Sequence, residues 1–305
     1  MLKSIGIHHI TAMVNDAQRN IDFYTDVLGL RLVKRTVNFE RPEVYHLYFG
    51  DYSGQPGTII TFFPWEKQLK GRIGTGQVGV TSYVIPKDSM PFWKNRLQQF
   101  GFEYETSIRF GEKILSFTDP DGLELELIER QVESSDHEVM GFAGATLFSA
   151  QPNKTAEILE NLFGMKCVGD ENGFLRFKAE ASVGNSIDIK LTPSVRGLMG
   201  AGTVHHIAFR AKDEKELFQW RELLLDKGYN PTEVRDRNYF KSIYFQDEGG
   251  ILFEIATDIP GFTVDESIEH LGEGLMLPPW LETKREALED QLPKVEVRIV
   301  EGNQS

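Results

Sequence analysis

The sequence predicts an α+β protein made of four βαβββ units, which pair into two curved-sheet domains with a C-terminal tail. The first observation is a helical pattern that closes on a glycine and leads into a strand. It occurs four times, and its glycines lie 72, 63 and 64 residues apart, at Gly29, Gly101, Gly164 and Gly228. The second observation is that a short strand pattern precedes each helix and further strands follow it. One such unit leaves a face of its sheet bare, so the units must pair to bury it.

Each unit can be followed along the chain. The strands that open the units are expected at 8–14, 78–85, 143–149 and 204–211. The helices lie in RNIDFYTDVLGLRLV, PFWKNRLQQFGFEYE, KTAEILENLFGMKCV and ELFQWRELLLDKGYNPTEV. The last strand of each unit opens after a glycine turn, in GQPGTIITFF, DPDGLELELIE, SVGNSIDIKL and EGGILFEIAT.

The units are expected to pair in chain order. The expected ranges are 1–130 for the first pair, with units at 1–70 and 71–130, 131–140 for a linker, and 141–258 for the second pair. The linker is predicted from the polar stretch RQVESSDHEVM. Residues 259–305 break the repeat. Within them MLPPWLETKREALEDQLP predicts a turn and a short helix that fold back over apolar surface of the body.

Composition limits the partners. A chain of 305 residues can bury a sizeable core, and its net charge of −13 argues against nucleic acid or an anionic membrane as partner. The single cysteine, Cys167, excludes an internal disulfide and suits a reducing compartment. MLKSIGIHHI holds no apolar signal core, and no apolar run is long enough to cross a bilayer. We therefore expect a cytoplasmic protein with no membrane partner, and leave a homo-oligomer open.

Two histidine pairs open equivalent strands, in GIHHITAMVND and GTVHHIAFRAKD. Side chains alternate faces along a strand. Ile10 and Ile207 belong to the apolar face that packs on the helices, so His9 and His206 point to the open, concave face, the cup. On the last strand of the fourth unit, Glu254 faces the cup by the same parity. Two histidines and one carboxylate with open coordination positions are typical of non-haem Fe(2+) oxygenases, so these three residues are predicted to bind a metal.

The other units lack this combination. At the positions of the two cup histidines they have Val80 and about Gly144. Glu126 and Asp188 match Glu254 in the repeat but have no histidine partners, so they are expected to be ordinary polar residues of a second cup. The equivalent position in unit one is Thr61, a poor metal ligand. One metal site is therefore predicted.

The repeats, with the motifs HHIT, FYTDVLGLRLV, VHHIAFR and EVRDRNYFKSIYFQDEGGILFEIA, resemble the vicinal oxygen chelate superfamily over residues 5–258. That superfamily contains glyoxalase I, extradiol dioxygenases and fosfomycin-resistance proteins, and the chain is most similar to its hydroquinone-type ring-cleaving dioxygenases. The resemblance implies that Fe(2+), with Mn(2+) as the alternative, is held by His9, His206 and Glu254. It implies a small aromatic substrate and O2 as reactants. It also implies roles around the metal for His8, Thr11, His205, Arg237 and Tyr244, with His8 and Thr11 binding substrate.

Ring cleavage also needs a proton donor. Tyr244 lies ten residues before Glu254, with a parity that puts it in the cup, and it matches the catalytic tyrosine of the extradiol enzymes. His46, in EVYHLYFGD, also faces the cup and suits proton transfer. His205 lies at a strand start on the opposite parity and is the other candidate histidine for this step. Arg237 could steady an anionic substrate oxygen. The structural alternatives are a hydrogen-bonded rim tyrosine for Tyr244, an ordinary sheet histidine for His46 and a surface charge for Arg237.

Three functions remain in competition at this point. A ring-cleaving dioxygenase is favoured, because Thr61 replaces the fourth protein ligand of glyoxalase I. The second is another metalloenzyme of the superfamily, a glyoxalase-like lyase or a thiol transferase. The third is a non-enzymatic protein that binds aromatic compounds and confers resistance to them.

Overall fold

The four predicted units are present in the structure, a computed structural model that describes residues 2–132, 134 and 136–298. Units one and two contain β1 (Ile7–Val14), α1 (Ala17–Asp22), β2 (Arg31–Val37), β3 (Tyr45–Gly50), β4 (Ile59–Pro64), β5 (Gln77–Pro86), α2 (Met90–Gln99), β6 (Glu105–Arg109), β7 (Glu112–Thr118) and β8 (Glu124–Arg130). Units three and four contain β9 (Phe142–Phe148), α3 (Pro152–Glu157), β10 (Lys166–Glu171), β11 (Phe174–Lys178), β12 (Ser186–Lys190), β13 (Thr203–Ala211), α4 (Glu214–Asp226), β14 (Arg235–Asp236), β15 (Phe240–Gln246) and β16 (Leu252–Pro260).

The helices end as the sequence predicts. The four stop glycines have φ of 71°, 79°, 71° and 84°, a region that side chains with a Cβ rarely adopt. In units one and three the last turn widens into a π-helical turn, at η1 (Phe23–Val27) and η2 (Ile158–Leu162). Among the described residues, no helix is long and apolar enough to cross a membrane.

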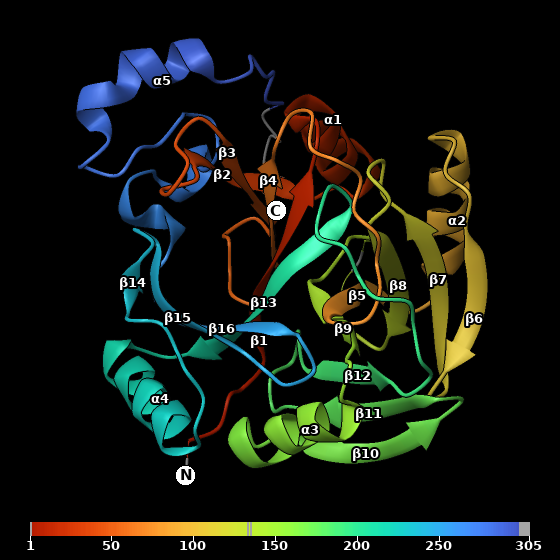
Figure 1. Ribbon diagram of the computed structural model, residues 1–305. Coiled ribbons are helices and arrows are strands. Elements are labelled where there is room, and N and C mark those ends of the chain that lie inside the picture. The colour runs from red at the N-terminus through yellow and green to blue at the C-terminus, as the bar shows by residue number, and fades with distance from the viewer. Residues whose placement is uncertain (1, 133, 135, 299–305) are drawn as a thin grey trace.

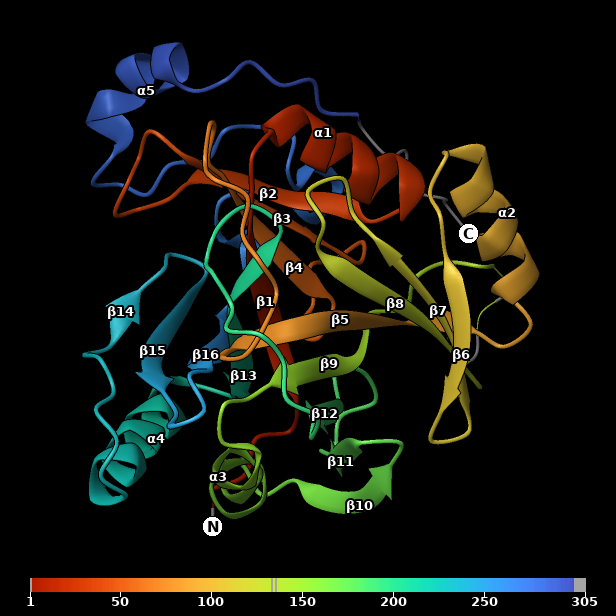
Figure 2. The same ribbon diagram turned by 45° about the vertical axis from the view of Figure 1, so that its right-hand side comes forward.

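The strands form two sheets of eight, and these sheets do not pair the units in chain order. The first has the order β14-β15-β16-β13-β1-β4-β3-β2 and joins units one and four. The second has the order β10-β11-β12-β9-β5-β8-β7-β6 and joins units two and three. The opening strands of all four units run through the centre of the molecule, with helices α1 to α4 outside (Figures 1 and 2).

This arrangement corrects the expectation that residues 1–130 and 141–258 each form a pair of units. Within a unit, the opening strand pairs only with the last strand, so its other edge is free. A free edge needs a second strand, and β1 takes β13 while β5 takes β9, both antiparallel. Each of the four opening strands has one free edge within its unit. The repeat therefore predicts that opening strands pair with each other, but the repeat alone does not tell which two units pair.

The core lies between the sheets and the helices. Ile10, Ala12 and Val14 of β1 pack into it, as do Ile207 and Phe209 of β13, which confirms the predicted parity. The concave face of the sheet from units one and four is called the first cup below, and that of the sheet from units two and three the second cup. The tail contains η3 (Phe262–Val264), η4 (Ile268–His270), η5 (Glu282–Lys284) and the predicted short helix, α5 (Arg285–Gln291), and lies against the β2–β3 end of the first sheet (Figure 1).

Asp119, in the turn before β8, is a buried carboxylate that ties unit two to unit one. Its Oδ1 accepts the backbone N–H groups of Asp121 and Leu123, and its Oδ2 accepts the hydroxyl of Tyr24 from η1 at 3.3 Å. Burial raises the pKa of the Asp119 carboxyl to about 6. The equivalent turn in unit four has Asp247, whose pKa burial also raises.

We expect Asp119→Asn to stabilise the protein at high pH. The unfolded chain releases this proton near pH 3.9 and the folded protein near pH 6, so this group's contribution to the free energy of unfolding is greatest below about pH 4 and falls as pH rises to about 6. Asparagine keeps the acceptor and carries no charge, so at pH 8 the variant should gain up to about 3 kcal/mol. Urea unfolding at pH 5 and pH 8 measures this. A difference between variant and wild type that is the same at both pH values would contradict it.

Candidate metal centre

The structure brings His9, His206 and Glu254 together at the centre of the first cup. They come from β1, β13 and β16, three neighbouring strands of one sheet. Glu254 Oε2 lies 3.1 Å from His9 Nε2 and 2.7 Å from His206 Nε2, and the two Nε2 atoms are 3.3 Å apart. All three side chains are buried, and one ligand atom of each lies within 4.8 Å of the others. No other group of three or more histidine, cysteine or carboxylate side chains among the described residues lies close enough together to hold a metal ion.

The first histidine of each pair orients the second. His8 Nε2 lies 3.1 Å from the carbonyl oxygen of Thr257, which can only accept, so His8 carries its proton on Nε2. In the neutral ring, His8 Nδ1 is then an acceptor, and it lies 2.9 Å from His9 Nδ1. His9 therefore donates from Nδ1 and leaves the lone pair of Nε2 directed at Glu254. Such partners fix the ring of a metal-binding histidine.

The second pair repeats part of this arrangement. His205 Nδ1 and His206 Nδ1 are 2.7 Å apart. When His206 Nε2 is kept free for a metal, Nδ1 donates to His205, and His205 carries its proton on Nε2. Burial, followed by the neighbouring His206, lowers the pKa of His205 to about 3, so its ring is neutral at physiological pH. His205 borders the pocket beside the three candidate ligands.

The Glu254 carboxylate has an environment that suits a cation. It is fully buried, and neither oxygen has a hydrogen-bond partner of good geometry among the described residues. Burial alone would raise the pKa of this carboxyl, but positive charge on His9 and His206 more than offsets it and holds the pKa well below the usual value, whereas the neutral rings offer Glu254 no donor from Nε2. A buried carboxylate without partners is costly. A divalent cation between Glu254 and the two Nε2 atoms would satisfy it, so this donor set fits the metal that the sequence predicts.

A pocket of about 350 Å³, within the range of small-molecule sites, opens over His9 and His206, while Glu254 lies buried beside them and does not border it. Its lining includes six aromatic side chains: Phe39, Tyr48, Phe63, Trp65, Phe240 and Tyr244. Tyr244 stands edge-on to the His206 ring, with centroids 5.4 Å apart, and burial raises its pKa above the usual value. The Arg237 guanidinium lies over the Tyr244 ring, 5.5 Å from its centroid. Both residues therefore line the pocket, as the sequence predicts.

His46 also lines the pocket, but both of its ring nitrogens are engaged. Nδ1 lies 2.8 Å from the hydroxyl of Tyr48, and Nε2 lies 2.8 Å from Thr61 Oγ1. Thr61 Oγ1 is in turn 2.8 Å from Thr11 Oγ1. Burial lowers the pKa of His46 well below its usual value, so the ring is neutral. Thr61, at the position of a missing fourth ligand, therefore holds His46 in place.

Two residues that the sequence assigned to substrate binding lie behind the pocket wall. Thr11 is fully buried against Thr61, and His8 is buried against His9 and Thr257. Neither borders the pocket. Their contacts in the structure are with the residues that do border it, so their role as substrate ligands remains a prediction.

The pocket mouth contains residues that the sequence analysis missed. Glu40, in the loop between β2 and β3, pairs with Arg235 and, at 3.4 Å, with Arg237. This contact joins unit one to unit four across the mouth. No repeat position or strand parity marks a loop residue, so the only available signal was the unusual pair of arginines in EVRDRNYF.

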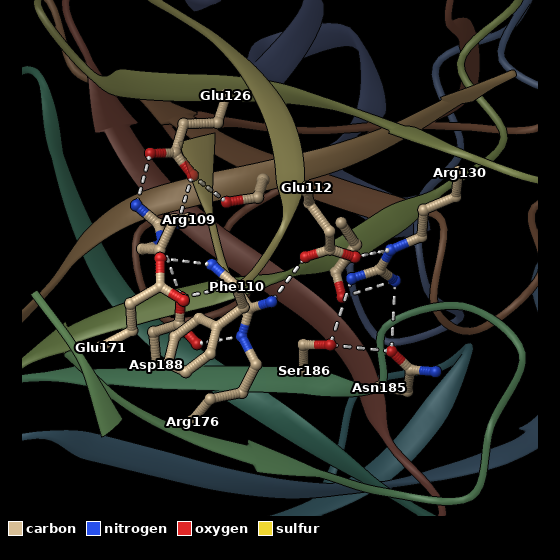
Figure 3. A network of polar contacts seen from close by, with 12 residues as sticks. Arg109, Phe110, Glu112, Glu126, Arg130, Glu171, Arg176, Asn185, Ser186 and Asp188 are labelled. Carbon is tan, nitrogen blue, oxygen red and sulfur yellow. Dashed lines mark hydrogen bonds and ion pairs between the residues drawn. The ribbon is translucent and has the colours of Figure 1, made fainter. Parts of the chain in front are cut away.

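The second cup contains buried arginines at the place where the first cup has its candidate ligands (Figure 3). Arg109 binds Glu126 with two hydrogen bonds, of 3.1 and 2.8 Å, and its Nε lies 2.9 Å from Asp188 Oδ2. Arg176 binds Asp188 through Nε and Nη2, at 2.7 and 2.8 Å. Glu126 and Asp188 are thus polar residues of the second cup, as expected, and both are buried members of an ion network. A guanidinium joins them at the positions equivalent to Thr61 and Glu254.

Comparisons with a family model, with curated proteins and with solved structures all lead to one superfamily and to proteins named dioxygenases. A family model described as the glyoxalase/bleomycin resistance protein/dioxygenase superfamily matches residues 6–127 and 141–255. MhqO of Bacillus subtilis (strain 168), provisionally named a ring-cleaving dioxygenase, is 54% identical over 97% of this chain and 98% of its own. The chlorohydroquinone/hydroquinone 1,2-dioxygenase of Sphingobium indicum is 33% identical over 93% of this chain and 94% of its own. A crystal structure of a B. subtilis protein, provisionally described as a dioxygenase, covers 98% of this chain and all of its own at 53% identity, with a TM-score of 0.96.

Proposed function

Because the chain belongs to the glyoxalase/bleomycin resistance protein/dioxygenase superfamily, we propose that it is an Fe(2+)-dependent dioxygenase that opens the ring of a hydroquinone or catechol. The observation that carries this proposal is the arrangement of His9, His206 and Glu254 around one point at the base of an aromatic pocket. Two histidines and one carboxylate would leave open positions on a metal for both substrates. The names of the relatives support the reaction class.

In this proposal the metal is Fe(2+), with Mn(2+) as the alternative that the same ligands would accept. A bound iron ion would supply the electron transfer between the aromatic ring and O2, and both oxygen atoms would enter the cleaved product. The protein's residues supply the rest. The flat aromatic walls hold the ring, and the Arg237 guanidinium offers a positive charge to a deprotonated substrate oxygen.

Protons are the other requirement of the reaction. The substrate must lose a hydroxyl proton, and the opened product must gain one. Tyr244, beside His206 and under Arg237, is the proposed donor, because it lines the pocket next to a candidate metal ligand and its hydroxyl is protonated at neutral pH. His205, with a proton on Nε2 next to the pocket, is the second candidate. His46 is the third, and it must exchange a bond with Tyr48 or Thr61 before it can act.

Oxygen uptake tests the proposal and separates it from its rivals. Protein loaded anaerobically with Fe(2+) should consume one O2 per molecule of methylhydroquinone and yield a ring-opened product by mass spectrometry. A glyoxalase-like lyase or a thiol transferase would instead turn over a thiol-containing substrate without consuming O2. A non-enzymatic protein would bind the aromatic compound and leave it unchanged. Either result would overturn the proposal.

Tyr244→Phe should slow turnover while keeping the metal. The hydroxyl is not a proposed ligand, and phenylalanine retains the ring that packs on His206. Loss of a proton-transfer group costs on the order of 10²-fold in rate. The loss should appear in kcat at least as much as in KM, because the proposed role lies in the transition state. Steady-state kinetics on iron-loaded protein measures it. Wild-type turnover in the loaded variant would leave His205 as the better candidate.

A further inference from the structure

The first part of the tail fills one side of the first cup. Phe262, in η3, is buried, and its ring centroid lies 5.1 Å from that of Tyr48 and 5.3 Å from that of Tyr239. Leu271 is buried in the same apolar cluster, which also contains Phe240. Tyr48 and Phe240 line the pocket and Phe262 does not. Phe262 therefore forms a layer directly behind the pocket wall.

A buried charge holds this part of the tail in place. Lys34 of β2 is completely buried, and its Nζ lies 2.5 Å from both Asp265 Oδ1 and Glu266 Oε2. Asp265 Oδ2 also accepts the hydroxyl of Tyr239 at 2.9 Å. Detaching this part of the tail would break both ion pairs of the buried Lys34, and breaking a buried ion pair is strongly destabilising.

Backbone contacts hold the tail along the same strand. Arg31 donates to the carbonyl oxygens of Ile268 and Glu269, at 2.7 and 2.8 Å. Further along, the Met276 N–H donates to the carbonyl oxygen of Arg35 at 2.9 Å. With the charge pairs at Lys34, these contacts make residues 261–272, called the rear wall below, a fixed part of the cup and not a lid.

The Tyr48 side chain connects the rear wall to His46. The Tyr48 ring packs on Phe262 at one side, and its hydroxyl lies 2.8 Å from His46 Nδ1 at the other. His46 stacks on Tyr48, with centroids 4.0 Å apart, and on Phe63, with centroids 4.4 Å apart. A shift of Tyr48 toward the space of Phe262 would therefore move His46 and deepen the pocket.

We propose that the rear wall sets the substrate size of this protein, and that Phe262 is the positioning residue that fixes Tyr48 and, through it, His46. This inference rests on the proposed function for its substrate class. It restricts that class to dihydroxyarenes whose ring substituents fit in front of the fixed Tyr48 and His46 side chains, because Phe262 fills the space behind Tyr48. The tail is then not a mere cover of apolar surface.

Phe262→Ala tests this by removing the layer behind Tyr48 without altering a residue that borders the pocket. The ratio of kcat/KM for tert-butylhydroquinone to that for methylhydroquinone should rise by about tenfold or more, since methylene-sized changes of an apolar pocket alter discrimination by roughly 10–200-fold. Phe262→Leu, which refills most of the space, should restore a ratio near that of the wild type. Leu288→Ala in α5 is the matched control. Leu288 is a tail residue about as buried as Phe262, but it packs in the large hydrophobic core and not in the apolar cluster of Phe262 and Tyr48. It should lower stability and leave the ratio unchanged.

A second measurement does not depend on turnover. The ¹⁵N chemical shifts of the His46 ring, assigned with His46→Gln, should change in Phe262→Ala and not in Leu288→Ala. Unchanged His46 shifts, or an unchanged substrate ratio, would overturn the proposal, as would the same change of ratio in Leu288→Ala. If the wild-type protein consumes no O2 with either hydroquinone, the dioxygenase proposal fails, and the His46 shifts still decide whether Phe262 positions the pocket.

Discussion

Glu254→Ala should remove tight metal binding and, with it, turnover. Glu254 is the proposed anionic ligand, and its Oε2 lies within 3.1 Å of both histidine Nε2 atoms at a fully buried position. The loss of a supporting partner of a ligand already costs roughly 10–100-fold in metal affinity or activity, and the loss of a ligand should cost more. His9→Ala and His206→Ala should behave in the same way. Anaerobic titration with Fe(2+), and metal content after gel filtration, measure the effect.

Glu126→Gln is the matched control, because Glu126 occupies the position in unit two that Glu254 occupies in unit four. Its carboxylate binds Arg109, and no histidine lies at the positions of Val80 and Gly144. This variant should keep full metal content. Full occupancy in Glu254→Ala, or a metal lost with Glu126→Gln, is incompatible with a single site formed by units one and four.

Arg109→Ala should be strongly destabilising. The Arg109 side chain is 11% exposed and neutralises Glu126 and Asp188, which are 7% and 4% exposed. Removing one partner of a buried ion pair leaves an uncompensated charge and typically costs about 3–5 kcal/mol. Here one guanidinium serves carboxylates from units two and three, so the second sheet loses a bond across its middle. Chemical denaturation of metal-free protein would measure the free energy of unfolding without a contribution from the first cup.

Two comparisons show whether uncompensated charge is the cause. Arg109→Met with Glu126→Gln removes the cation and one anion together, and should recover part of the loss. Lys154→Ala removes a pair with Glu157 that is more than half exposed on both sides, and such pairs contribute about 1 kcal/mol or less. If Arg109→Ala costs no more than Lys154→Ala, the network in the second cup is not a major source of stability.

Much of the fold follows from local rules that the sequence displays directly. Gly29, Gly101, Gly164 and Gly228 each stop a helix with a positive φ, and strand parity places His9, His206 and Glu254 on one concave face. These features depend on residues near each other in the chain, or on a repeat that marks equivalent positions. The order of units in the sheets depends on which free edges meet, and the four edges themselves are similar. The signal for the choice was the predicted ligand set, because His9 of unit one can share a metal with His206 and Glu254 of unit four only if these two units form one cup.

The surroundings of the candidate site were harder to predict. Tyr48 has the cup parity of His46, but its importance arises from Phe262, more than 200 residues later, which supports its ring. Arg109 is the last residue of β6, and nothing in its neighbourhood marks it as the partner of Asp188. Glu40 and Arg235 meet across a pocket between two units. Each of these contacts is set by tertiary packing, which a periodic pattern does not encode.

Units one and four, which form one sheet, lie before and after units two and three in the chain, and this order has a consequence for synthesis on the ribosome. Units two and three follow each other in the chain, so their sheet can close while the fourth unit is still being made. The first unit must wait with the free edge of β1 unpaired until β13 emerges. His9 and Glu254 are 245 residues apart, which at 5–20 residues per second is a delay of roughly 10–50 s. A chain that ends before Glu254 therefore lacks at least one of the three candidate metal ligands, and the candidate site is completed only late in synthesis.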